Sequence, residues 1–460
     1  MSPCPALLAV AVLTAPASEE PAYSYEVSAG PEARVLEVSA RFVPGSGGVL
    51  VLERGLLDFV DGAEIEAHGA WRRLERSGAA LLAPECEGLG CRIRYRFRLA
   101  PAAREVRDLH RALEHEGALL APPSSWLLRP LRATSGRFRF SVRTAPGTSF
   151  VSGVLPVPGL AGAYEADIAC FDSAAYSGFG AFDTVRFDVP GGGAELAIAP
   201  GERQLDDAAL RLWAEQAAGA VSGYFGRLPV PRVLILVLPG GRRPVGFGSM
   251  LGSGGASVMI FVGRQAGDQD LARDWVLTHE LTHLGFPDLG AAPSWIEEGL
   301  ATYLEPLARA RVGLLSEAAA WGELVEGLPR GLPGRGDAGL DAAQGFRRIY
   351  WGGALYWLLC DLELRERTGN ARGLQDVLRK LVAAGGNGSV SWSLERALDE
   401  LERAAGERVF RERLRRMGSE PVRVDLAALW KWLGIARGAG GVAFDESAPL
   451  STIRRSLTAR

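Results

Sequence analysis

The strongest constraint on the fold is a change in hydrophobic period near residue 206. Before that point apolar residues tend to recur at every second position, most regularly in Cys91–Leu99, where arginines alternate with apolar side chains. A half-buried antiparallel strand has this alternation, so we interpret the arginines as the solvated face of a sheet. From Asp206 to Phe225 the apolar spacing becomes close to helical. The pattern therefore predicts a β-rich first half followed by a half that contains most of the helices.

The second half combines buried strands with several helices. Two apolar runs, Val233–Leu238 and Ser257–Val262, predict buried strands. Helices are expected at about 272–285, 294–308, 316–326, 347–368, 394–405 and 407–417. We expect an α+β multi-domain chain with these parts: a signal peptide at 1–18, an all-β N-terminal domain at 19–200, a catalytic domain at 201–385 and a helical C-terminal region at 386–460.

Composition excludes several classes of protein. The 460 residues include 51 Lys+Arg and 54 Asp+Glu, a formal net charge of −3, and 47% of the residues are hydrophobic. This balance is typical of globular domains, and it argues against a nucleic-acid partner held by bulk basicity. No run reaches the ~18–20 apolar residues of a membrane helix, so no transmembrane segment is expected. Oligomeric state is not indicated.

The N-terminal residues and the cysteines favour export. An apolar run, Cys4–Ala15, leads into the small-residue sequence Ala-Pro-Ala-Ser that ends at Ser18, as a signal peptide does. No Lys or Arg precedes the run, so a misplaced start or an ordinary terminus stays open as an alternative. Cys86 and Cys91 bracket a Gly-containing turn, and we expect a disulfide there in an oxidising compartment. With the Arg, Ala and Gly bias of a GC-rich genome, the sequence predicts a periplasmic or secreted bacterial protein.

The segment with the clearest chemistry is His279-Glu280-Leu281-Thr282-His283. Two histidines four positions apart share one face of a helix, and neutral imidazoles in that arrangement can bind one Zn²⁺. Glu280 lies between them in sequence, where its carboxylate can reach a water molecule as a general base. Chance occurrence in a solvated helix is the alternative. It is disfavoured because the chain has only 5 histidines and two of them lie here.

A catalytic zinc site needs a third protein ligand. A second helix is expected to begin near Ser294, and it carries Glu297 and Glu298 in adjacent positions. Adjacent helical residues point about 100° apart, so only one of these carboxylates can face the histidines. The residues alone leave the choice between them open.

The combination of His279-Glu280-Leu281-Thr282-His283 with Trp295-Ile-Glu-Glu-Gly-Leu-Ala-Thr-Tyr-Leu-Glu305 resembles the gluzincin metallopeptidases. The similarity is greatest to the glycyl aminopeptidase family and more distant to aminopeptidase N. It has varying strength from about residue 165 to the end. The resemblance implies a thermolysin-like catalytic domain and a single Zn²⁺ ion on His279, His283 and Glu298, the Glu that precedes Gly299. It also implies Glu280 as the catalytic base and a supporting hydrogen bond from Glu305, for which a solvated position is the alternative.

A further match lies in Ile349-Tyr-Trp-Gly-Gly-Ala-Leu355, where the resemblance implies that Tyr350 donates a hydrogen bond to the oxyanion. Gly352 stands where these families have Lys. Aminopeptidase N relatives also carry an acidic residue before the zinc helix, and the corresponding stretch 248–261 has none. The choice between aminopeptidase and endopeptidase is therefore open, and Val258–Val262 is the expected edge strand for an extended peptide.

These features predict a zinc-dependent metallopeptidase acting on a peptide or protein substrate, with Glu280 and Tyr350 as catalytic residues. Two alternatives remain from the sequence. One is a catalytically idle protein that carries zinc and binds peptides. The other is a non-peptidase hydrolase that uses the same site.

Overall fold

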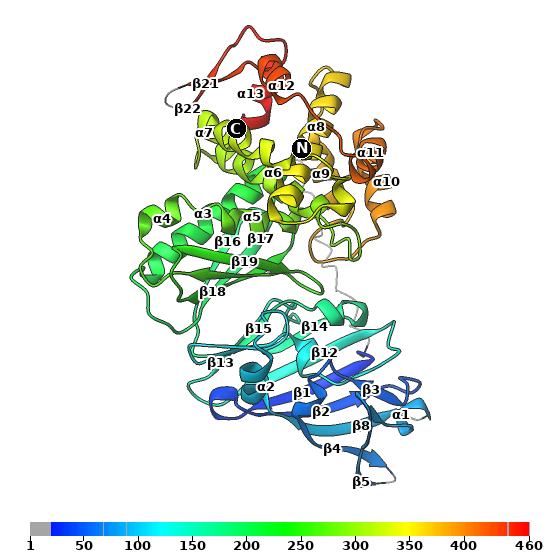
Figure 1. The fold of residues 1–460 in the computed structure, drawn as a ribbon. Helices are drawn as coiled ribbons and strands as arrows, with labels where there is room; N and C mark the ends of the chain where they lie inside the picture. The colour runs from blue at the N-terminus through cyan, green and yellow to red at the C-terminus, as the bar shows by residue number, and fades with distance from the viewer. Residues whose placement is uncertain (1–19, 68, 89, 439–440, 460) are drawn as a thin grey trace, which may run out of the picture.

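The computed structural model describes residues 20–67, 69–88, 90–438 and 441–459. The expected signal peptide, 1–18, lies outside the described residues. Figure 1 shows a β-rich N-terminal part, in blue to cyan, below a mixed part in green and a helical part in yellow to red. Within the described residues, no helix has the length and apolar character needed to span a bilayer.

The N-terminal part contains one large sheet and two small ones. The large sheet has the order β14-β12-β1-β2-β8-β4-β5. Its strands are β1 (Tyr23–Ala29), β2 (Leu36–Phe42), β4 (Val60–Ala67), β5 (Ala70–Arg73), β8 (Cys91–Phe97), β12 (Arg137–Thr144) and β14 (Ala163–Asp167). One small sheet consists, in order, of β13 (Ser149–Ser152), β15 (Ser177–Gly180), β10 (Ala118–Leu120) and β9 (Leu113–His115). The other consists, in order, of β11 (Arg129–Pro130), β3 (Val49–Val51), β7 (Ala80–Leu82) and β6 (Glu75–Ser77).

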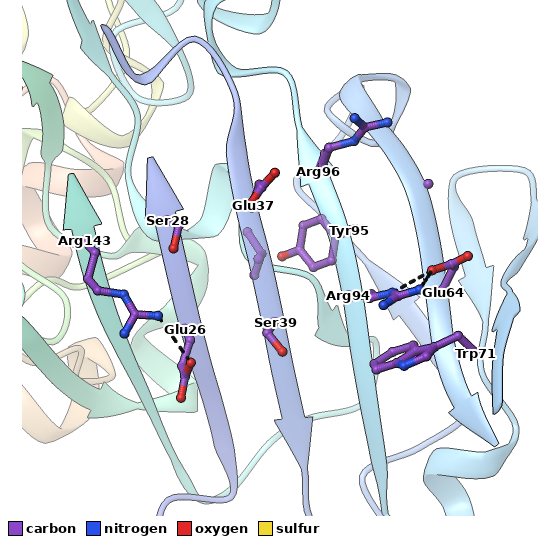
Figure 2. A pocket seen from close by; sticks show the side chains of 12 residues that line it. Glu26, Ser28, Glu37, Ser39, Glu64, Trp71, Arg94, Tyr95, Arg96 and Arg143 are labelled. Atoms are coloured by element: carbon purple, nitrogen blue, oxygen red, sulfur yellow. Dashed lines mark hydrogen bonds and ion pairs between the residues drawn. The ribbon is translucent and has the colours of Figure 1, made fainter. Parts of the chain in front are cut away.

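The arginine alternation has the structural meaning that the sequence predicts. Along β8 the arginines are exposed and the apolar residues between them are buried. Figure 2 shows Arg94 and Arg96 on the outer face of the large sheet, over a shallow hollow of about 650 Å³. Arg94 pairs with Glu64 at 2.7 Å and lies 4.3 Å from the ring centre of Trp71. This face is a solvated surface of cross-strand ion pairs, remote from the histidines.

The N-terminal part is β-rich but not all-β, which corrects the sequence prediction. It contains the short helix α1 (Glu85–Gly88) before β8 and the helix α2 (Leu99–Val106) directly after β8. The sequence of α2 has three alanines, the best helix formers. Pro101 lies in the first turn, where no N–H partner is needed. The expected disulfide between Cys86 and Cys91 is present, and it links α1 to the start of β8.

The mixed part is built on a five-stranded sheet with the order β16-β17-β18-β20-β19. Its strands are β16 (Asp183–Val189), β17 (Gly192–Ile198), β18 (Arg232–Pro239), β20 (Ser257–Val262) and β19 (Val245–Leu251). β17 and β18 are parallel, joined by helix α3 (Asp207–Phe225). The sheet of the mixed part therefore begins with β16, within the range expected for the N-terminal domain.

The edge strand differs from the expected one. β20 lies between β18 and β19 and pairs with both. Among the strands that the structure describes, β19 pairs with β20 alone, so β19 is an edge strand of this sheet. The sequence of β19 contains two glycines and lacks the continuous apolar run of a buried strand, so its pattern does not predict a strand. β20 is therefore an interior strand, and β19 takes the edge position that was expected for Val258–Val262.

Helices cover the sheet and form the C-terminal region. They are α4 (Asp268–Ala272), α5 (Val276–Thr282), α6 (Trp295–Val312), α7 (Glu317–Gly327), α8 (Phe346–Arg367), α9 (Leu374–Ala383), α10 (Leu394–Ala405), α11 (Arg411–Ser419), α12 (Leu426–Leu433) and α13 (Ser451–Thr458), with a hairpin of β21 (Ile435–Gly438) and β22 (Gly441–Phe444). The helix expected at 272–285 is divided. Asp274 accepts hydrogen bonds from the N–H groups of Val276 and Leu277, at 2.9 and 3.1 Å, and so begins a new helix.

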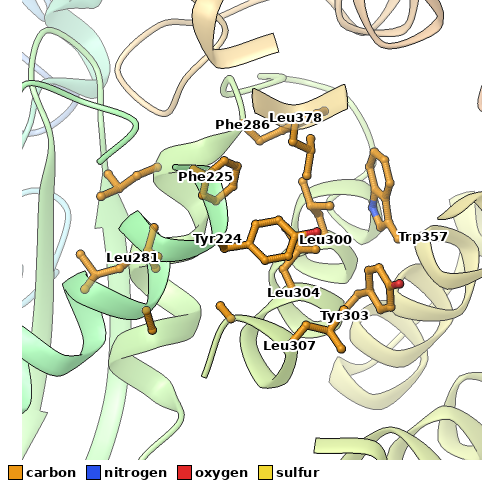
Figure 3. Packing of buried hydrophobic residues seen from close by; sticks show 14 of the residues in the cluster. Tyr224, Phe225, Leu281, Phe286, Leu300, Tyr303, Leu304, Leu307, Trp357 and Leu378 are labelled. Carbon is orange, nitrogen blue, oxygen red and sulfur yellow. The ribbon is translucent and has the colours of Figure 1, made fainter. Parts of the chain in front are cut away.

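The core around α3, α5, α6 and α8 fixes the positions of the functional residues. Figure 3 shows Tyr224 and Phe225 of α3 packed among Leu281 of α5, Leu300 and Leu304 of α6, and Trp357 of α8. Helices α6 and α8 approach at backbone distance. A Cβ added at Gly299 would lie 2.3 Å from the Cα of Gly353, and one added at Gly353 would lie 2.0 Å from the carbonyl oxygen of Trp295. No larger residue fits this crossing without moving a helix.

The crossing predicts that Gly353→Ala lowers stability by roughly 1–3 kcal/mol, because the added methyl group overpacks a backbone contact. The matched control is Gly219→Ala in α3, where an added Cβ meets no atom within 4 Å. There alanine should raise helix stability by about 0.5–1 kcal/mol. Urea unfolding of both variants beside wild type measures the difference. Equal effects of the two substitutions would contradict the packing argument.

Candidate functional site

The two histidines of the motif lie on one side of α5 and its continuation. His279 is buried within α5, and His283 begins the short 3-10 turn His283–Gly285. Their ring centres are 5.1 Å apart and the rings are nearly perpendicular. This spacing follows from one turn of helix, and both imidazoles face α6.

Glu298, in the first turn of α6, brings a carboxylate to both imidazoles. Its Oε2 lies 3.2 Å from the Nε2 of His279 and 3.7 Å from the Nε2 of His283. In the described part of the chain, these three residues form a group whose potential ligand atoms all lie within 4.8 Å of one another. Two imidazole nitrogens and a carboxylate oxygen are a donor set that suits zinc.

Glu297, the adjacent carboxylate, makes a different contact. Its Oε1 accepts a hydrogen bond from the N–H of Leu289 at 3.1 Å. Burial raises the pKa of Glu297 to about 7. Burial also disfavours the charged form of Glu298, but the hydrogen bond from His279 and the nearby imidazole of His283 outweigh it and hold the pKa of Glu298 well below its usual range. The carboxylate that faces the imidazoles is therefore the charged one.

His283 responds in the opposite sense. Burial alone would lower the pKa of His283, yet the nearby carboxylate of Glu298 raises that pKa to about 9. A protonated imidazole cannot ligate a metal, so a cation binding here would have to displace that proton.

Glu280 lines a cleft of about 330 Å³ together with His283, Glu298 and the edge strand β19. Burial raises its pKa, while the neighbouring histidines lower it. A Cβ at Gly248 of β19 would lie 2.7 Å from the Cγ of Glu280. Glycine at 248 therefore allows the free strand edge to pass directly beside this carboxylate. Ser173, from the N-terminal part, also lines the cleft. The sequence does not predict this contribution, because Ser173 lies far from the histidines along the chain.

Tyr350, in the first turns of α8, joins the same site. Its ring is nearly parallel to that of His279, with ring centres 5.7 Å apart, and its outer face stacks on Phe346 at 3.7 Å. Burial and the adjacent Glu298 raise the pKa of the Tyr350 hydroxyl far above its usual value. The hydroxyl therefore stays protonated and can act as a hydrogen-bond donor at any ordinary pH.

Glu305 does not have the supporting position that the resemblance implies. It is buried, but its Oε1 accepts a hydrogen bond from the Nη1 of Arg309 at 2.5 Å, one turn further along α6. The Nδ1 of His279 is buried and has no hydrogen-bond partner in the described part of the chain. An Arg four residues after a Glu on one helix predicts an ion pair, and Arg309 has this position relative to Glu305.

Comparison with known proteins gives a fold and no sequence family. No family model matches the chain, and no curated protein matches it in sequence. Solved structures do match in fold. An aminopeptidase N family protein from Idiomarina loihiensis superimposes with a TM-score of 0.69 at 15% identity, over 90% of this chain and 78% of its own.

An M1 zinc metallopeptidase from Deinococcus radiodurans matches with a TM-score of 0.56 at 16% identity, over 88% of this chain and 94% of its own. A mutant of an M1 zinc metallopeptidase from that organism, bound to a Tyr-Ser-Ala substrate, matches equally well. The chain therefore has an M1 aminopeptidase-like fold, with a sheet-rich N-terminal part, a mixed centre and a helical C-terminal region.

The geometry predicts which glutamate supports metal binding. Purified wild-type protein supplied with zinc should hold about one ion, as an open three-ligand site does. Glu298→Ala should lose most of it, because two imidazoles alone are a weaker site. Glu297→Ala, the same truncation one position earlier, should keep it. Elemental analysis after gel filtration measures all three, and equal loss from the two variants would contradict the assignment.

Proposed function

We propose that this chain is a zinc-dependent metallopeptidase of the gluzincin type, with a thermolysin-like catalytic domain, which hydrolyses peptide bonds. One observation carries the proposal: a His₂Glu donor set, a separate carboxylate and a phenol hydroxyl converge at one end of a cleft lined by a free strand edge. The fold likeness to M1 zinc metallopeptidases supports it.

The residues present fit a zinc ion. His279, His283 and Glu298 would hold it, and their donor atoms are those that zinc prefers. Three protein ligands leave a coordination position for substrate or solvent, which distinguishes a catalytic from a structural site. When bound, zinc supplies a Lewis acid that acidifies water and polarises a carbonyl group.

Glu280 moves the proton. Its carboxylate lies in the cleft beside His283 and Glu298 without being part of the three-residue donor set. It accepts a proton from the water that attacks the carbonyl carbon of the substrate. A carbon–oxygen bond forms, and the same carboxylic acid then delivers the proton to the leaving nitrogen as the carbon–nitrogen bond breaks. The raised pKa of Glu280 favours this second step, because the group must hold a proton before it can donate one.

Tyr350 and β19 orient the substrate. The hydroxyl of Tyr350 donates a hydrogen bond to the carbonyl oxygen as it gains negative charge. The free edge of β19 pairs with the backbone of an extended peptide, and this pairing places the peptide across Glu280. A peptide ligand is consistent with the Tyr-Ser-Ala substrate named for a Deinococcus radiodurans metallopeptidase of similar fold.

The idle peptide-binding protein is less consistent with the site than the enzyme. A binding protein has no need for a carboxylate in the cleft beside the donor set, or for a phenol stacked against a ligand histidine. The disulfide between Cys86 and Cys91 suits an oxidising compartment, which supports the proposed export to the periplasm or medium.

The proposal predicts that Glu280→Gln keeps its zinc and loses peptidase activity by a factor of about 100 or more, since the amide cannot accept the proton. Matched Glu297→Gln, which changes a cleft carboxylate outside the donor set, should keep most activity. Hydrolysis of a mixed peptide library, followed by mass spectrometry, measures both. Full activity in Glu280→Gln would rule out the assigned base.

A further inference from the structure

A second cavity of about 330 Å³ lies beside the site, and the mechanism above does not use it. His279 and Tyr350 form part of its wall, together with Thr302 and Pro306 of α6. Tyr350 lines this cavity and the cleft of Glu280 alike. The side chain whose hydroxyl contacts the substrate carbonyl in the proposed reaction therefore borders both hollows.

The walls of this cavity are aromatic. Trp275, Phe346, Tyr350 and Trp351 all line it. Trp275 and Phe346 are 43% and 56% exposed, although they are large apolar residues. Phe346 stacks on Tyr350, and Trp275 packs edge-on against His279 at 5.6 Å between ring centres. Exposed apolar surface gathered around a hollow, rather than scattered singly, indicates a surface that a ligand covers.

The charged residues of the cavity already have partners. Glu305 and Glu323 share Arg309, at 2.5 and 3.7 Å, and Glu326 pairs with Arg330 at 2.6 Å. A basic side chain entering the cavity would therefore compete with guanidinium groups that are already in place. Apolar contact with the four rings is what the cavity offers without breaking an ion pair.

We propose that this cavity is a specificity pocket for the side chain of a residue that flanks the scissile bond, and that it takes large apolar side chains, aromatic ones first. The inference rests on the proposed peptidase function and names its preferred substrates. Ring-on-ring contact adds a favourable interaction to the burial of an aromatic side chain. Because the pocket adjoins the reacting carbonyl, that contact is retained in the transition state and raises kcat/KM.

The test uses wild-type, zinc-loaded protein and a library of short peptides with every residue type on either side of each bond. Mass spectrometry of the products gives the preference at both flanking positions. At one of them, Phe, Tyr, Trp and Leu should be cleaved with kcat/KM about 10-fold or more above Ala, a ratio within the range that a hydrophobic pocket can produce.

Two variants change the pocket from different sides. Phe346→Ala removes an aromatic wall, and Thr302→Leu fills the cavity from α6 while leaving the aromatic walls intact. Both should reduce the Phe-to-Ala ratio of kcat/KM at that position by about 5-fold or more, while cleavage after or before Ala continues. The control is Trp432→Ala, since Trp432 is 57% exposed, as Phe346 is, but lies on α12 outside both hollows. Its ratio should stay at the wild-type value.

The outcomes separate this inference from the proposed function. Wild-type protein that holds zinc and cleaves no peptide would overturn the proposed function. Cleavage with no preference for large apolar residues, or a preference that neither variant alters, would overturn the pocket alone. A preference for Arg or Lys that is lost in Glu323→Gln would also overturn it, since the carboxylates would then outweigh the rings.

Discussion

The crossing of α6 and α8 is the contact on which the site depends. Gly299 and Gly353 meet at backbone distance, so the helix that carries Glu298 and the helix that carries Tyr350 begin close together. Without that approach, the carboxylate and the phenol could not both reach the imidazole of His279. Because neither glycine has a side chain, the two helix backbones can touch at this point. Glu298 and Tyr350 are therefore both held on helices rather than on loops.

A second constraint is electrostatic. Glu298 is a half-buried carboxylate, and the hydrogen bond from His279 together with the nearby imidazole of His283 holds its pKa well below the usual range. His283 in turn has a raised pKa because Glu298 faces it. The three groups lie close enough together to hold one cation, and their donor atoms are those that zinc prefers.

The sequence predicts much of this arrangement, because the strongest signals are local. Helical spacing places His279 and His283 on one face, and the alternation in Cys91–Leu99 predicts β8 and its solvated arginines. Contacts between distant segments were not predictable. The break at Asp274 depends on a side-chain cap, and the edge position of β19 depends on pairing order. The residues alone do not show whether Glu297 or Glu298 faces the histidines. The resemblance favours Glu298, and the orientation of α6 places that side chain against His279. Glu305 shows the limit of that resemblance, since Arg309 lies closer to it than the site does.

The most direct test of the central claim is a crystal structure of the zinc-soaked protein, with anomalous data collected on both sides of the zinc absorption edge. The account predicts one strong anomalous peak within roughly 2.0–2.2 Å of the Nε2 atoms of His279 and His283 and of a Glu298 carboxylate oxygen. A peak elsewhere, a peak coordinated by Glu297, or no peak at saturating zinc would contradict it.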